Sequence, residues 1–311
     1  RSECGRKSQM GTVGALGSRR AYGLRVARMV TFVALLSSAV WGTADFVGGL
    51  WAKRFHPVKV VALSQLGGLV AALIFFGVVS LAGTHGSSDW TSWATWGVGA
   101  GLSGAVGLMC LYAALSSGTM GVVSPITALG AIVPVVLGLV RGDAWTPSIG
   151  IGLLVALAGA VLASGPELSG DVGRRPVVLA CISALGFGVS LYCMDGGARH
   201  DLSGAMLAMR CGSLTLLLPT LFALRSKGLA REPLTRRDVL VLPLLGMGDL
   251  TANLLFAAAS AQGQVSIVAV LGSLYPVATL LLARVVLAER LRMVQLVGVA
   301  LTVVGVVLVT L

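Results

Sequence analysis

The segment Gly152-Leu-Leu-Val-Ala-Leu-Ala-Gly159 returns 146 residues later (152 to 298) as Gly298-Val-Ala-Leu-Thr-Val-Val-Gly305. The pair Trp41-Gly42 returns at the same offset as Phe187-Gly188. Self-similarity at a fixed spacing indicates that a chain is built from copies of one unit. Further matches, shifted by short gaps in the turns, are residues 111–114 with 255–258, and Leu129, Gly130 and Pro134 with Leu271, Gly272 and Pro276.

The composition places these copies in a membrane. The 311 residues are 56% hydrophobic and only 11% charged, whereas soluble domains carry about 25% charged residues. This excludes a soluble globular enzyme, a disordered chain and a small disulfide-stapled domain. Ten apolar runs are each close to the ~20 residues that a membrane helix needs. The runs are residues 30–50, 58–82, 94–115, 120–140, 147–163, 176–194, 202–224, 239–261, 265–287 and 293–311.

Five runs fall in each half of the chain, at residues 30–163 and 176–311. Because five is odd, the second half must enter the membrane upside down relative to the first. We therefore predict an all-α polytopic membrane protein of ten transmembrane helices, arranged as two inverted five-helix repeats. Inverted repeats are typical of secondary transporters, whose substrate site lies near the bilayer midplane between the halves. A duplicated scaffold that transports nothing is the alternative.

The first 28 residues differ from the rest of the chain. Residues 1–28 contain seven Lys or Arg and one Glu, and they account for much of the net charge of +11. We expect a basic leader that is disordered, or that is not native and precedes a start at Met29. A cytoplasmic tail or targeting segment is the alternative. Nucleic acid is not an expected partner, because no basic and aromatic groove pattern appears.

No metal site or bound cofactor is expected from the sequence. The three histidines, His56, His85 and His200, are far apart and fall between apolar runs. The cysteines show none of the close spacings that hold zinc or form redox pairs. We interpret them as small packing residues; they are Cys4, Cys110, Cys181, Cys193 and Cys211.

Several short motifs together resemble the EamA family of the drug/metabolite transporter superfamily, over essentially all of residues 30–311. The motifs are Trp41-Gly42 with Phe46, Ala288-Glu289-Arg290-Leu291, residues 295–298 with Gly305, and the prolines Pro134 and Pro276. The resemblance implies a ten-helix transporter of small metabolites, often an exporter, with a central path lined by both halves. The first half departs from the pattern with residues 142–145, and the second has Phe187 in place of tryptophan. None of these motifs identifies the substrate.

Ionisable side chains inside a membrane are costly, so each is a candidate for function. Asp249 lies ~16 Å into its run and Arg210 ~12 Å into the neighbouring one, at 1.5 Å per residue. The two runs are antiparallel neighbours, so Arg210 can reach Asp249. A carboxyl group in a low dielectric can hold a proton near neutral pH, which would make Asp249 a proton relay. A fixed Arg210–Asp249 pair that only joins two helices is the alternative.

The third ionisable candidate, Asp45, lies toward the end of the first run, where it could be either functional or simply hydrated. Gln65 and Asn253, with Ser64 and Thr251, are polar groups that could line a path or only bridge helices. Trp41 and Tyr275 could gate the path or stack on a substrate, although packing is the commoner role of a buried aromatic. Pro134 and Pro276 should kink their helices and are the hinge candidates.

These observations favour a secondary transporter of small metabolites or drugs in the cell (plasma or inner) membrane. Its expected partners are a small-molecule substrate, the lipid bilayer and protons; its oligomeric state is not predicted. A lipid or lipid-linked-sugar flippase and a non-transporting scaffold are the alternatives. A membrane-integral enzyme is disfavoured, because no cluster of Asp, His and Glu appears. No residue is assigned a catalytic role.

The orientation stays open at this stage. If the chain starts at Met29, one side of the membrane has two basic residues, Arg141 and Arg199, and the other has twelve. Because positive residues concentrate on the inner side, this count places both termini outside. The family resemblance more often implies termini inside.

Overall fold

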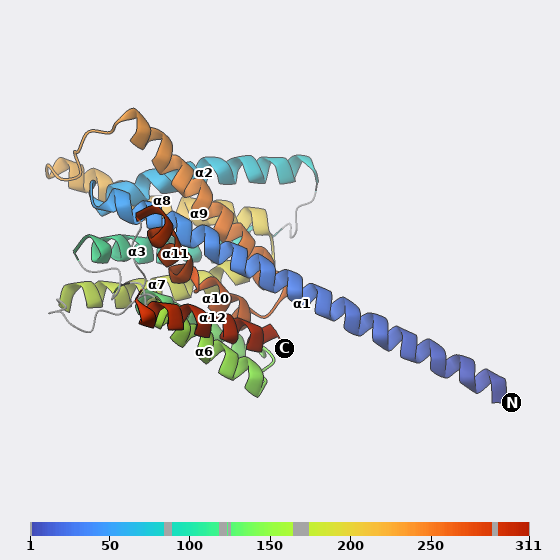
Figure 1. The fold of residues 1–311 in the computed structure, drawn as a ribbon. Helices are drawn as coiled ribbons and strands as arrows, with labels where there is room; N and C mark the ends of the chain where they lie inside the picture. Colours follow the sequence, from blue (N-terminus) through green and yellow to red (C-terminus); the bar gives the residue numbers. More distant parts are fainter. Residues whose placement is uncertain are drawn as a thin grey trace.

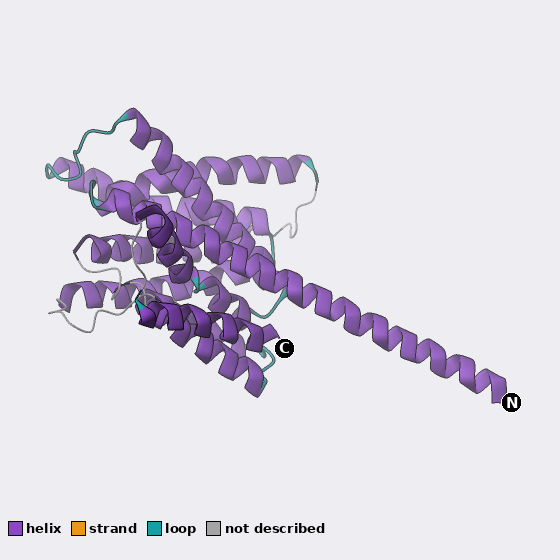
Figure 2. Cartoon of the chain, viewed as in Figure 1, coloured by secondary structure: helices purple, strands orange, loops and turns teal. Residues whose placement is uncertain are grey.

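The computed structural model describes residues 2–83, 89–117, 123, 126–163, 174–287 and 292–310. Within these ranges the chain is helical and forms no strand (Figures 1 and 2). The helices are α1 (Ser2–Ala52), α2 (Pro57–Leu81), α3 (Trp90–Ser117), the 3₁₀ turn η1 (Leu129–Ala131), α5 (Ile132–Val140), α6 (Pro147–Ala163), α7 (Arg174–Ala198), α8 (Leu202–Ser226), α9 (Arg236–Gln262), α10 (Val265–Gly272), α11 (Tyr275–Leu287) and α12 (Met293–Thr310).

Six of the described helices are long and apolar enough to cross a membrane: α1 from Arg25 onward, α2, α3, α7, α8 and α9. Four further apolar stretches are shorter, at Ile126–Val140, Pro147–Gly159, Val265–Thr279 and Met293–Gly305. Large apolar side chains point outward, including Phe222 (76% exposed) and Leu154 (70% exposed). An outer surface of this kind is unfavourable in water and suits contact with lipid.

The helices pack in a repeated pattern of neighbours. α3 lies along α7 and α8, α9 lies along α1 and α2, and α6 lies along α12 (Figure 1). Small residues allow the closest of these contacts. A Cβ added to Gly101 of α3 would overlap the carbonyl oxygen of Met209, and one added to Gly246 of α9 would overlap that of Ser64. Such close backbone approach is how membrane helices associate without large side chains between them.

Two apolar stretches are interrupted just before a proline. α10 ends at Gly272 and α11 begins at Tyr275, so Pro276 lies in the first turn of α11. Pro134 lies in the first turn of α5, directly after η1. Proline has no N–H to donate to the preceding turn and is tolerated best at a helix start. The expected kinks are therefore helix breaks, and residues 265–287 form two helices rather than one.

α1 continues as a helix from Ser2 and projects away from the bundle (Figure 1). The disordered or non-native leader expected at residues 1–28 stays a prediction. Once a helix exists, each added residue gains a hydrogen bond, so a helix extends more readily than it starts. Residues 195–198, which lie beyond the end of the predicted run 176–194, also belong to α7. The motif residues 288–291 lie outside the described residues.

Candidate functional site

A cavity of about 90 Å³ lies between the helices. Its walls come from α1, α2, α3, α7, α8, α9 and η1, together with the break between α10 and α11. The seven side chains predicted from the sequence as substrate or coupling candidates all line it: Trp41, Asp45, Gln65, Arg210, Asp249, Asn253 and Tyr275. The polar residues that were scattered along five apolar runs therefore meet at one place.

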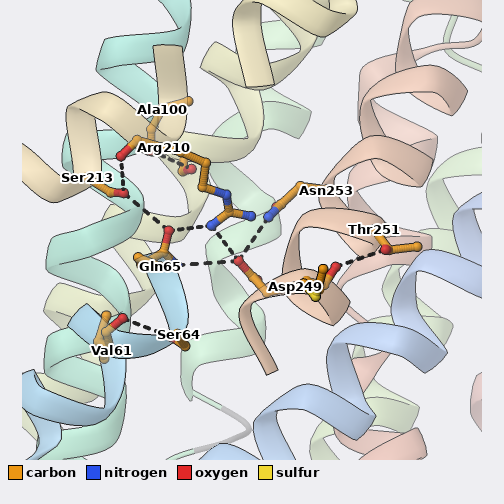
Figure 3. A network of polar contacts seen from close by, with 11 residues as sticks. Val61, Ser64, Gln65, Ala100, Arg210, Ser213, Asp249, Thr251 and Asn253 are labelled. Atoms are coloured by element: carbon orange, nitrogen blue, oxygen red, sulfur yellow. Dashed lines mark hydrogen bonds and ion pairs between the residues drawn. The ribbon is translucent and has the colours of Figure 1, made fainter. Parts of the chain in front are cut away.

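An ion pair joins α8 to α9 at this cavity. Nη1 of Arg210 donates to Oδ2 of Asp249 at 2.8 Å, as the antiparallel arrangement of the two runs predicts (Figure 3). The same Nη1 also donates to Oε1 of Gln65 on α2. The Arg210 side chain is 2% exposed and that of Asp249 is 19% exposed. The guanidinium of Arg210 is thus buried inside the protein, while the carboxylate of Asp249 is partly accessible from the cavity.

Asp249 is held by donors from three helices. Besides Arg210, Nδ2 of Asn253 donates to Oδ2 of Asp249 at 3.1 Å and Nε2 of Gln65 does so at 3.4 Å (Figure 3). Ser213 donates to Oε1 of Gln65 at 3.2 Å and thereby orients its amide. All three donors are aimed at the same carboxylate oxygen, which holds it in one position. This arrangement supports the fixed-pair interpretation of Asp249 over that of a proton relay.

Arg210 retains unused donor groups. Its Nε and Nη2 atoms are buried and have no hydrogen-bond partner in the part of the chain that the structure describes. Gly68 of α2 lies against the guanidinium, since a Cβ added there would be 3.1 Å from Nε. Unpaired buried N–H groups cost free energy, so Arg210 depends strongly on the one carboxylate that it does contact.

Asp45 has a different environment from Asp249. It is half-buried on α1 and lines the cavity, although the sequence suggested a position nearer the end of the span. No hydrogen bond or ion pair links it to another described residue. One turn further along α1, a Cβ added to Gly48 would overlap the hydroxyl of Tyr112, so this phenol packs directly against the helix backbone. Asp45 is therefore a carboxyl group in the cavity without a fixed partner among the described residues.

Two aromatic side chains complete the cavity wall. Trp41 packs on Phe256 with ring centroids 5.6 Å apart. The Tyr275 hydroxyl lies 2.7 Å from Oγ1 of Thr127 and shares a hydrogen bond with it. Both aromatics are thus held in place by neighbours while one side faces the cavity. The pairing of Tyr275 with Thr127 was not predicted, because nothing in the sequence relates these two residues.

Two other candidate polar residues do not line the cavity. The Ser64 hydroxyl donates to the carbonyl of Val61 in its own helix, and the Thr251 hydroxyl donates to that of Met247 (Figure 3). Sequence reasoning missed Ser213, which is nearly buried and contacts Gln65. Its position one turn after Arg210 on α8 is the signal that could have identified it.

Charged contacts join distant segments at one end of the bundle. The side chain of Asp195 on α7 is fully buried and pairs with Arg141 at 3.2 Å and with Arg199 at 3.0 Å. Its hydrogen bond raises the pKa of Arg199, which keeps the guanidinium charged. Nearby, Oδ2 of Asp143 accepts from the Ser266 hydroxyl at 2.6 Å. We call these residues the Asp195 cluster.

Arg199 of the Asp195 cluster also donates to the carbonyl oxygen of Ser260, near the C-terminal end of α9, and a second group of contacts lies near the N-terminal end of that helix. Asp238, whose side chain is also fully buried, accepts from Nε1 of Trp51 at 2.9 Å. Lys59 lies 3.5 Å from the carboxylate of Glu232. We call these four residues the Asp238 cluster. Both clusters join segments before residue 164 to segments after residue 173, and they lie on opposite sides of the cavity along α9.

Metal binding has no support in the part of the chain described: no group of three or more His, Cys, Asp or Glu side chains is arranged to hold an ion there. Of the residues that the structure describes, Asp45 and Asp249 are the acidic side chains that line the cavity. What the cavity offers chemically is therefore a set of hydrogen-bonding groups, two carboxylates and aromatic walls.

Comparisons with known proteins agree with this architecture. Residues 174–311 match the family model of the EamA-like transporter family. A crystal structure described only as that of a protein superposes with a TM-score of 0.71 at 20% sequence identity, covering 91% of this chain and 98% of the other. At that identity the likeness shows the fold alone. No curated protein matches the chain. By this match, residues 174–311 of a multi-pass membrane protein belong to the EamA-like transporter family, part of the drug/metabolite transporter superfamily.

Proposed function

We propose that this protein is not an enzyme but a secondary transporter that exports small metabolites or drugs across the cell membrane. In this proposal the ten apolar stretches are ten transmembrane helices, arranged as two inverted repeats at residues 30–163 and 176–311. The substrate binds in the central cavity, which opens alternately to either side. The observation that carries the proposal is the cavity itself, because α1, α2, α3 and η1 line it from the first half and α7, α8, α9 and the α10–α11 break line it from the second.

The pattern of helix neighbours supports the repeat. Exchanging the two halves converts the contacts of α3 with α7 and α8 into those of α9 with α1 and α2. The same exchange leaves the contact between α6 and α12 unchanged, because these two helices are the last ones of the two halves. There, Gly159 lies against the backbone nitrogen of Thr302 and Gly305 lies against that of Ala156. Gly159 and Gly305 are 146 residues apart, and so are Ala156 and Thr302, so the two contacts are equivalent in the two halves.

The Asp195 and Asp238 clusters support alternating access. Each is a set of contacts between the two proposed repeats, and they lie on opposite sides of the cavity. Breaking one cluster while keeping the other would open the cavity to one side only. Pro134 and Pro276, each next to a helix break, are the proposed hinges, because a break lets one part of a span move without bending the rest. Coupling to protons is part of the proposal, with Asp45 as the carboxyl group free to bind one.

Accessibility of the cavity tests this function without knowledge of the substrate. In a variant lacking the five native cysteines, Leu108→Cys places a single thiol in the cavity lining. We expect a membrane-impermeant thiol reagent to label it from either side of sealed vesicles, because each side is exposed in turn. The control Ser226→Cys, at the exposed end of α8, should be labelled from one side only. Labelling of Leu108→Cys from a single side, or from neither, would favour a scaffold.

A further inference from the structure

The charged groups of the cavity do not balance. Arg210 is the one basic side chain among its lining residues, whereas Asp45 and Asp249 are both acidic. Arg210 is paired with Asp249 at 2.8 Å. Among the described residues, Asp45 is therefore left without a counterion, and the described lining has a net charge of minus one when its charged groups are ionised. A negative charge in a site of low dielectric attracts a cation strongly.

The charged groups that a ligand can reach are also negative. The guanidinium of Arg210 is 98% buried, since its side chain is only 2% exposed, and Gly68 packs against its Nε. Its two unpaired donors are likewise buried. An anion would have to displace Asp249 or separate α2 from α9 to reach them. Asp45 is half-buried and Asp249 is 19% exposed, so carboxylate oxygens are what the cavity presents.

The wall beside Asp45 suits an organic cation better than a metal ion. Trp41 lies one helical turn before Asp45, so both side chains occupy the same face of α1, and both line the cavity. Tyr275 faces the cavity from the other half of the chain. Alkylammonium groups bind well between a carboxylate and aromatic faces, whereas small hard cations need several oxygen ligands.

We propose that the cavity is a binding site for a compact organic cation, with the ammonium group paired to Asp45 and packed against Trp41. This deepens the transport function proposed above by naming the substrate class, but the binding site does not require transport to occur. The volume of about 90 Å³ limits the ligand in this conformation. A cavity of about 150 Å³ holds benzene, so the cation has only a few heavy atoms.

Three probes that share a branched methyl head test the charge preference. They are tetramethylammonium (a cation), glycine betaine (a zwitterion) and trimethylacetate (an anion). Equilibrium binding of each radiolabelled probe is measured on the purified full-length chain in detergent. We expect saturable binding of tetramethylammonium, at least tenfold weaker binding of glycine betaine and no binding of trimethylacetate. Asp45→Asn should weaken tetramethylammonium binding at least tenfold, and Asp45→Glu should restore part of it.

Asp89→Asn is the matched control, because it removes an equal charge outside the cavity, directly before α3. Its affinity should equal that of the wild type. Unchanged unfolding temperatures would show that Asp45→Asn is folded. The proposal is overturned if Asp45→Asn binds tetramethylammonium as well as the wild type does, if trimethylacetate binds more tightly, or if no probe binds.

Counterflow of the same probes in proteoliposomes separates this proposal from the transport function. Asp45-dependent binding of tetramethylammonium without flux would support the cation site and contradict transport. Flux of trimethylacetate or glycine betaine, without binding of tetramethylammonium, would support transport and contradict the cation site.

Discussion

Replacing Arg210 with glutamine is expected to destabilise the protein more than replacing Arg210 and Asp249 together. The single change leaves the Asp249 carboxylate without its charged partner, and removing one member of a buried pair costs on the order of 3 kcal/mol. The double change Arg210→Gln with Asp249→Asn removes both charges and should recover at least half of the lost stability. Thermal unfolding in detergent, followed by tryptophan fluorescence, measures both.

The exposed Arg225, near the end of α8, provides the control. Arg225→Gln removes the same charge from the same helix and should leave the unfolding temperature almost unchanged, because the residue lies in solvent. If Arg210→Gln were as stable as Arg225→Gln, the ion pair would contribute little to folding. Asp249 would then be free for a role in coupling.

Gly246→Ala should prevent correct packing of α2 against α9. The added Cβ would overlap the carbonyl oxygen of Ser64, which is backbone and cannot turn aside as a side chain could. The two helices must separate, which also disturbs Gln65 and Asp249 on either side of their contact. We expect a loss of several kcal/mol, at or above the ~1–3 kcal/mol usual for overpacking, together with a low yield of monodisperse protein.

Gly248, two residues along the same helix, has no heavy atom within 4 Å of an added Cβ. Gly248→Ala should therefore be neutral or stabilising by up to about 1 kcal/mol, because alanine favours the helix over glycine. Size-exclusion chromatography and unfolding temperature compare the two variants. Equal behaviour of Gly246→Ala and Gly248→Ala would show that α2 and α9 do not approach as closely as described.

The long helices and the members of the cavity could be predicted from the sequence. Apolar runs define their own spans, because a lipid environment requires the whole backbone to be hydrogen-bonded within each helix. The cavity residues could be predicted for the complementary reason. Ionisable and amide groups such as Asp45, Gln65 and Asn253 are too costly in an apolar run unless they meet one another.

Side-chain partners could not be predicted in the same way. Asp195, followed by Gly196 and Gly197, resembles a turn, yet it is a fully buried residue within α7. Gly196 does not form a turn but leaves room for the ring of Trp96, since an added Cβ would lie 2.7 Å from that ring. A single sequence gives no information on which distant residue fills the space beside a glycine. Which side chains surround Asp45 could likewise not be predicted.

The two buried carboxylates at the ends of the bundle, Asp195 and Asp238, affect how readily either end can separate. Each carboxylate gives up its hydration because it is buried, and this cost offsets much of what its contacts with the partly exposed Arg141 and Arg199, or with Trp51, contribute to stability. When the two halves move apart, water replaces the lost contacts and this hydration is regained. Apolar side chains in the same positions would gain nothing on separation. In the proposed transport cycle, the two clusters would therefore define the closed geometry and yet separate at low free-energy cost, as repeated opening and closing of either end requires.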